Sequence, residues 1–288
     1  MSYDLFMKPK NEDVSLEHFQ SYFETRKNYS IEGSQAWYQN EETGVYFVFE
    51  YQGEEEGEEE SFPLAFNMNY FRPSFFVQEA EPEIREFISK FDLAVDDPQT
   101  NGMGAGEFSS EKFASGWLHG NEFGYQSILR DNPDVHTLPS TQLEKVWAWN
   151  FSKERLQNEV TDDVFVPSIM IFNYQGKTVT ACVWPDAIPS IIPPVDILLI
   201  GRKKLAQRKF FRKVEDMAIG TWSVVQPLLD SHKNKMQGEA YYLYYQAVPS
   251  EIKKKIQSLT PLDVATLERL SVDQVLNREL VQRYLGSV

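Results

Sequence analysis

Residues 36–52 read AWYQNEETGVYFVFEYQ and carry the clearest strand signal in the chain. The run Val45 to Phe49 contains only β-branched and aromatic residues, which favour strands. Residues 36–40 form a second run of the same kind, and residues 40–44 supply a polar turn that ends in glycine. Two such runs joined by a short glycine-containing loop predict a β-hairpin, with strands over 36–40 and 45–52.

The flanking sequence extends this hairpin into a sheet with helices. Met1–Lys8 and Phe62–Phe71 are predicted strands, and Leu93–Val95 is a short third one. Ser15 is a predicted helix N-cap, and Pro82 suits the first position of a second helix. This order of elements indicates an α+β fold, with mixed or antiparallel sheets and helices packed on one face.

A polar, proline-containing stretch at residues 131–140 is the best candidate for a linker. It predicts two halves, an acidic α+β half over 1–138 and a second α+β half over 139–288. The second half contains an apolar run at 195–200 that suits a buried strand, and Thr260-Pro261 is a start signal for C-terminal helices.

Composition limits the class of protein. The chain has 288 residues, of which 42% are hydrophobic, enough for a substantial core. No apolar run approaches the length of about 18 residues that a membrane span needs, and the N-terminus shows no secretory signal. A single cysteine, Cys182, excludes an internal disulfide and fits a reducing compartment. We therefore expect a cytoplasmic protein that does not bind membranes.

The net charge of −15 is distributed unevenly. Residues 1–145 contain 28 acidic and 10 basic residues, a net charge of −18, whereas the remainder has a net charge of +3. An acidic surface repels nucleic acid phosphates and attracts basic proteins. The charge pattern thus predicts a basic protein partner and no nucleic acid.

Two regions of the acidic half are the predicted partner-binding surface. The first is a glutamate-rich loop, predicted to be exposed, that contains Glu54, Glu55, Glu56, Glu58, Glu59 and Glu60. The second surrounds a glycine-rich loop and the helix predicted after it, and contains Asp96, Asp97, Glu107, Trp117, His119 and Glu122.

The same region supports an alternative hypothesis. The glycine loop at 102–106 precedes a predicted helix at 110–129, in which Gly116, Gly120 and Gly124 share one face. Each mid-helix glycine costs roughly 1 kcal/mol relative to alanine, so close packing or a ligand should compensate. The alternative is an enzyme that acts on a small polar substrate bound at this face.

No other pattern indicates catalysis. The four histidines are scattered, no metal-binding spacing is present, and Cys182 lies in an apolar segment that favours a buried, inert thiol. We therefore predict no catalytic residue, no metal and no cofactor. A basic cluster at 202–213 can pair with the acidic half, bind a phosphate or remain solvated.

Four stretches resemble bacterial immunity proteins, which neutralise polymorphic toxins delivered by contact-dependent or type VI secretion systems. They are Met1–Leu5, Thr43–Phe47, Asn69–Pro73 and Val195–Leu199. The resemblance implies a catalytically inert protein that binds a cognate toxin domain and blocks its active site. It implies no particular fold, because these proteins share none.

The leading hypothesis is therefore an immunity-type protein that binds a basic toxin domain through its acidic half. The alternatives are the enzyme described above and a structural or adaptor protein within a larger assembly. The sequence also leaves homo-oligomerisation open.

Overall fold

The computed structural model describes residues 1–53, 62–206, 208–209, 212–213 and 215–286. The chain forms two compact units. Unit 1 comprises Met1–Leu143 together with Asp273–Val288, and unit 2 comprises Glu144–Val272. Both combine helices with antiparallel or mixed sheets, which confirms the α+β prediction. The units differ from the predicted halves 1–138 and 139–288, because the C-terminal segment belongs to unit 1.

Unit 1 is built on a seven-stranded antiparallel sheet with the order β2-β3-β4-β5-β1-β6-β7. The predicted hairpin is confirmed as its β3–β4 pair. The strands are β1 (Ser2–Pro9), β2 (Tyr29–Glu32), β3 (Gln35–Asn40), β4 (Val45–Tyr51), β5 (Leu64–Asn69), β6 (Leu93–Asp97) and β7 (Gly104–Gly106).

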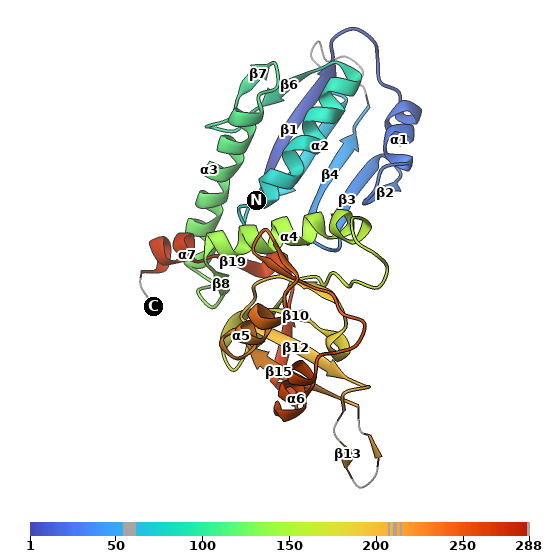
Figure 1. Ribbon diagram of the computed structural model, residues 1–288. Helices are drawn as coiled ribbons and strands as arrows, with labels where there is room; N and C mark the ends of the chain where they lie inside the picture. Colours follow the sequence, from blue (N-terminus) through green and yellow to red (C-terminus); the bar gives the residue numbers. More distant parts are fainter. Residues whose placement is uncertain (54–61, 207, 210–211, 214, 287–288) are drawn as a thin grey trace. The chain divides into compact units, whose positions relative to one another are not determined.

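Three helices cover one face of this sheet, which we call the inner face: α1 (Leu16–Glu24), α2 (Phe76–Phe91) and α3 (Ser110–Leu129). The ring of Phe49 on β4 lies 4.8 Å from that of Phe87 on α2 and 5.2 Å from that of Phe23 on α1. The ring of Tyr3 on β1 lies 5.1 Å from that of Phe113 on α3. Figure 1 shows α2 lying over the sheet, beside β1 and β4. Because side chains alternate along a strand, the remaining positions form an opposite, outer face.

The helix boundaries agree with the sequence signals in two of three cases. The Ser15 side chain accepts a hydrogen bond from the backbone of His18 and caps α1, and α3 spans the predicted residues. The prediction for α2 was wrong, since it begins at Phe76 and contains Pro82 within it. Burial of Phe76 and Val77 against the core outweighs the local preference of proline for a first turn.

The C-terminal segment completes unit 1 through a parallel pair of strands, β8 (His136–Leu138) and β19 (Val275–Asn277), and helix α7 (Arg278–Leu285). The buried Asn277 side chain donates to the hydroxyls of Ser74 (2.8 Å) and Ser140 (2.9 Å). The Tyr125 hydroxyl donates to Asn277 Oδ1 over 3.2 Å and accepts from its backbone N–H over 3.1 Å. Buried polar atoms require such partners, so Asn277 fixes the segment in place.

Unit 2 contains a five-stranded mixed sheet, a three-stranded sheet and a two-stranded ribbon. Its elements are α4 (Ser140–Asn158, of which Ser140–Leu143 fall in unit 1), β9 (Met170–Tyr174), β10 (Lys177–Val183), η1 (Pro185–Ala187), β11 (Ser190–Ile192), β12 (Ile197–Arg202), β13 (Arg208–Lys209), β14 (Arg212–Lys213), β15 (Asp216–Thr221), α5 (Trp222–His232), β16 (Lys235–Gln237), β17 (Ala240–Leu243), α6 (Ser250–Ser258), η2 (Val264–Thr266), β18 (Leu267–Leu270) and η3 (Val272–Gln274, which reaches into unit 1).

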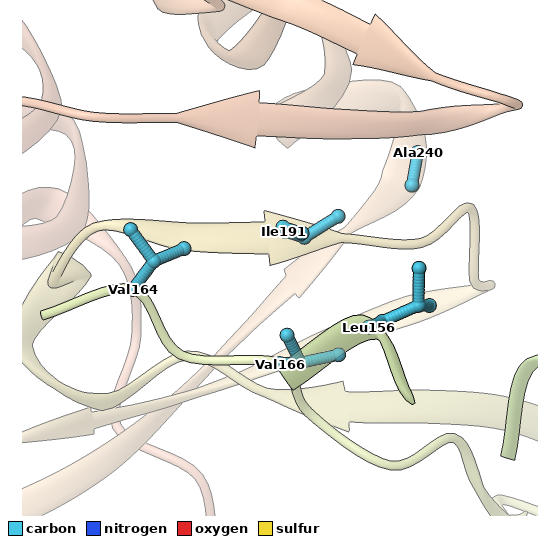
Figure 2. Close-up of a cluster of buried hydrophobic side chains, with 5 residues drawn as sticks. All are labelled: Leu156, Val164, Val166, Ile191 and Ala240. Carbon is cyan, nitrogen blue, oxygen red and sulfur yellow. The ribbon is translucent and has the colours of Figure 1, made fainter. Parts of the chain in front are cut away.

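One hydrophobic cluster of unit 2 joins α4 to the strands. Leu156 packs with Val164, Val166, Ile191 and Ala240, all of them less than a tenth exposed (Figure 2).

The apolar run at 195–200 forms part of β12, as predicted. The prediction that a helix starts at Thr260-Pro261 is wrong, because η2 and β18 occupy that part of the chain. Of the described helices, none has the length and apolar character needed to cross a membrane.

Candidate functional site

The structure places the twelve predicted partner-binding residues in very different environments. Glu54, Glu55, Glu56, Glu58, Glu59 and Glu60 lie outside the described residues. The segment that contains them joins β4 to β5, which are neighbours in the sheet. The other six residues are described, and the structure does not gather them into one surface.

Asp97 is buried, and its carboxylate organises the glycine loop. One oxygen accepts from the Tyr3 hydroxyl (2.5 Å) and from the backbone N–H of Met103 (2.8 Å). The other accepts from the backbone N–H of Gln99 (3.1 Å). Burial, together with the hydrogen bond to Asp97, raises the pKa of Tyr3 far above its usual value. The Asp97 side chain is only 3% exposed, so it is not available as a docking contact. The prediction that Asp97 binds a partner is therefore corrected, and its role is structural.

Trp117 is likewise fully buried, and the glycine face beside it is filled. A Cβ atom on Gly120 would lie 2.2 Å from the ring of Tyr70, and one on Gly124 would lie 3.3 Å from the Tyr70 Cβ. A Cβ on Gly116 would lie 3.3 Å from the carbonyl oxygen of Asn101. The glycines therefore let neighbouring chain approach α3 closely, which is the packing role considered from the sequence.

The glycine loop is packed in the same way. A Cβ on Gly102 would lie 2.3 Å from the carboxylate of Asp97. Side chains therefore occupy the space at the glycine face where the alternative hypothesis requires a small polar substrate.

Glu107, Glu122 and His119 are at least partly accessible, but both glutamates are paired. Glu107 lies 2.8 Å from Lys10 Nζ, and Glu122 lies 3.0 Å from Arg283 of α7. His119 is exposed on α3. Exposed ion pairs of this kind contribute little stability, but they do reduce the negative potential at their site. Asp96, the sixth residue, lies on the outer face of the sheet, opposite Phe6.

Other acidic residues of the helical layer are also neutralised or buried. Arg26 forms ion pairs with Glu83 and Glu86, each at 2.8 Å. Glu79 is 2% exposed and accepts hydrogen bonds from Tyr38 (2.7 Å), Asn40 (2.7 Å) and Thr43 (3.1 Å). These carboxylates therefore belong to the architecture, whereas Glu17 and Glu24 of α1 are exposed and form no ion pair among the described residues.

The outer face of the sheet carries carboxylates without basic neighbours in the same rows. Of these carboxylates, the sequence predicted only Asp96 as a binding residue. One row of laterally paired residues crosses all seven strands: Glu32, Gln35, Glu50, Ala65, Phe6, Asp96 and Ala105. The adjacent row consists of Ser30, Trp37, Val48, Asn67 and Asp4. The two rows hold four carboxylates and no basic residue. The alternation of residues along each strand is the signal that could have revealed this face.

None of these four carboxylates forms an ion pair with any residue that the structure describes. Neutral amides hold two of them instead. Asn67 Nδ2 donates to Asp4 (2.5 Å), and Gln35 Nε2 donates to Glu50. Such donors orient a carboxylate without cancelling its charge.

A cleft of about 660 Å³ lies elsewhere in unit 1, between the start of α1 and the end of α2. His18 and Tyr22 line it from α1, and Lys90 and Asp92 from the end of α2. Asp92 is already bound by Asn11 (2.8 Å) and Lys10 (3.4 Å). None of the predicted site residues lines this cleft.

Two described residues of the basic cluster at 202–213, Arg202 and Lys203, have partners within their own unit. The Arg202 side chain is fully buried, forms a bidentate ion pair with Asp216, and donates to the carbonyls of Ile256 and Leu259. Lys203 lies 3.7 Å from Glu215. Arg202 therefore stabilises the end of α6 rather than offering a charge to a partner.

In the part of the chain that the structure describes, no group of three His, Cys, Asp or Glu side chains is placed to hold a metal ion. Cys182 is fully buried, and burial raises the pKa of its thiol well above the usual value. A thiol that resists ionisation is a poor nucleophile.

Comparison of the chain with protein-family models, curated proteins and solved structures gives no match.

Proposed function

We propose that this chain is an immunity-type protein that binds and neutralises a basic toxin domain through unit 1. One observation carries the proposal: unit 1 contains 29 acidic and 11 basic residues, a net charge of −18, whereas unit 2 has a net charge of +3. A compact unit with that charge attracts a basic protein and accelerates its association.

Two features of the structure support this proposal. The glycine face that an enzyme hypothesis would use is packed by Tyr70 and Asp97. The charge of unit 1 is also only partly compensated internally, because the carboxylates of the outer face lack ion-pair partners among the described residues. Uncompensated charge on a folded surface costs stability through self-repulsion, which a basic partner would relieve.

Neutralisation is the direct test. The product of the gene adjacent to that of this chain is expressed in a host cell with and without the chain, and we expect it to arrest growth when expressed alone. We expect the chain to restore growth, and the purified pair to form a complex whose affinity falls as the NaCl concentration rises from 50 to 500 mM. Failure to protect the host, together with no binding to the adjacent gene product at low salt, would exclude the proposal.

A further inference from the structure

We infer that the basic partner docks on the outer face of the seven-stranded sheet. Trp37 would be the apolar anchor, and Glu32, Glu50, Asp96 and Asp4 would receive lysine or arginine side chains. This inference rests on the proposed function and specifies the surface that performs it.

Carboxylates of unit 1 differ in whether a basic side chain compensates their charge. On the helical side Arg26, Lys10 and Arg283 neutralise carboxylates at distances of 2.8–3.0 Å. On the outer face Lys8 is the nearest basic residue in the sheet register, one row beyond Phe6. Its ammonium group lies 4.9 Å from the centre of the Phe62 ring. The outer face therefore retains its negative charge for a partner from outside.

The outer face also carries accessible apolar side chains. Trp37 is 37% exposed, whereas Val48, its lateral partner on β4, is 5% exposed, so Trp37 supplies the accessible apolar surface of this pair. Phe6 is partly exposed near the middle of the acidic row, and its lateral partner Ala65 is buried. Tryptophan is enriched among the residues that dominate binding energy, and its ring also attracts lysine and arginine. Apolar centres flanked by charge are typical of docking surfaces.

The side chains of Trp37 and Glu50 are already held in place in the absence of a partner. The Trp37 indole N–H donates to Gln35 Oε1 over 3.1 Å, and the amide of Gln35 in turn donates to Glu50. One glutamine thus orients both the proposed anchor and a proposed charge. Side chains that are already ordered lose less entropy when a partner binds.

The spacing of the strands also sets the spacing that cations on a partner protein would need. Strands lie about 4.8 Å apart, so Glu32 and Glu50 are separated by roughly 10 Å, and Glu50 and Asp96 by roughly 14 Å. A protein surface that presents cations at such intervals around an apolar contact would match the row. Nucleic acid would not, because its phosphates would be repelled by the same carboxylates.

The test uses a 20-residue oligolysine peptide as the probe, with binding measured by isothermal titration calorimetry in 50 mM NaCl. The outer-face variant Glu32→Gln/Glu50→Gln/Asp96→Asn is compared with the control Glu17→Gln/Glu24→Gln/Asp131→Asn. Both variants remove three carboxylates from unit 1, and the control removes exposed ones that lie off the sheet. Circular dichroism establishes that each variant is folded.

We expect the outer-face variant to lose about tenfold or more in affinity, and the control less than about threefold. Trp37→Ala should also weaken binding several-fold with little change in the thermal midpoint. Equal losses in the two triple variants would overturn the docking surface while leaving the proposed function intact. Failure of the unmodified chain to bind oligolysine would overturn both, since each requires an accessible acidic surface.

Discussion

The two faces of the sheet in unit 1 use similar residues for different purposes. The inner face buries Tyr3, Tyr38 and Phe49 against three helices, and the carboxylates Glu79 and Asp97 on that side are enclosed by hydrogen-bond donors. The outer face carries aromatic and acidic residues as well, yet its Trp37 is 37% exposed and its carboxylates lack ion-pair partners among the described residues. The number of carboxylates on a face therefore does not show whether they serve the fold or a binding protein. Their intramolecular hydrogen bonds and ion pairs do.

Phe49 and Glu50 provide the largest expected contrast, because they are neighbours in β4 that point to opposite faces. Phe49→Ala should lower the free energy of unfolding by about 3–5 kcal/mol, since it removes a fully buried ring that contacts α1 and α2. Glu50→Ala should change it by less than about 1 kcal/mol. Urea denaturation followed by circular dichroism measures both. Similar losses in the two variants would mean that the outer face is also part of the core.

Glu79 and Glu86 make the next comparison, between two carboxylates of α2. Glu79→Ala should cost about 3 kcal/mol, because it leaves the donors of Tyr38, Asn40 and Thr43 without their acceptor in a buried site. Glu86→Ala removes an ion pair with Arg26 in which the Glu86 side chain is 61% exposed, and should cost less than about 1 kcal/mol. The same denaturation experiment compares them, and a loss of under 1 kcal/mol for Glu79→Ala would contradict the structural role given to that residue.

Gly120 tests whether the glycine face is truly filled. Gly120→Ala should destabilise unit 1 by about 1–2 kcal/mol, because the new methyl group would displace the ring of Tyr70, and this outweighs the better helix propensity of alanine. In a Tyr70→Ala background the same substitution should become neutral or stabilising. A double-mutant cycle in urea measures this coupling, and additive effects would show that the face is open.

Much of this architecture could be predicted from local patterns. The β3–β4 hairpin follows from the residue types in 36–52, and α3 was placed at its observed ends from its capping serine and apolar residues. In both cases the decisive information is carried by residues close together in the chain. Pro82 shows the limit, because the burial of residues further upstream moved the start of α2 to Phe76.

What could not be predicted depends on partners distant in the sequence. Gly120 and Gly124 of α3 are explained by Tyr70, about fifty residues earlier, and the C-terminal segment is held by Asn277 through Ser74 and Tyr125. The candidate site was missed for the same reason. The sequence places the charge in the first half of the chain, and alternation along each strand indicates which of its side chains share a face, but only the strand pairing shows which carboxylates lie in neighbouring rows of the outer face.

Tyr22 gives the smallest expected change in the free energy of unfolding. It lies in the helical layer at a position where a different side chain would make the fold more stable. Its hydroxyl is buried without a hydrogen-bond partner among the described residues, whereas its ring packs between Phe23 and Phe87. Tyr22→Phe should therefore raise the free energy of unfolding by up to about 1 kcal/mol at pH 7, because it removes a desolvated polar group and keeps the ring.

The effect of Tyr22→Phe should grow in alkali. Burial raises the pKa of Tyr22 well above its ordinary value near 10, despite the nearby Arg26. Above pH 10 the unfolded chain releases this proton while the folded chain keeps it, so the unmodified protein loses stability there. The variant has no such proton, so its advantage in the free energy of unfolding should increase by about 1 kcal/mol at pH 11. Tyr29→Phe is the matched control, because the Tyr29 hydroxyl donates to Glu83 over 2.9 Å. It should destabilise the protein at pH 7, and a gain in stability there for Tyr29→Phe as well would mean that the hydrogen bond from Tyr29 to Glu83 contributes nothing.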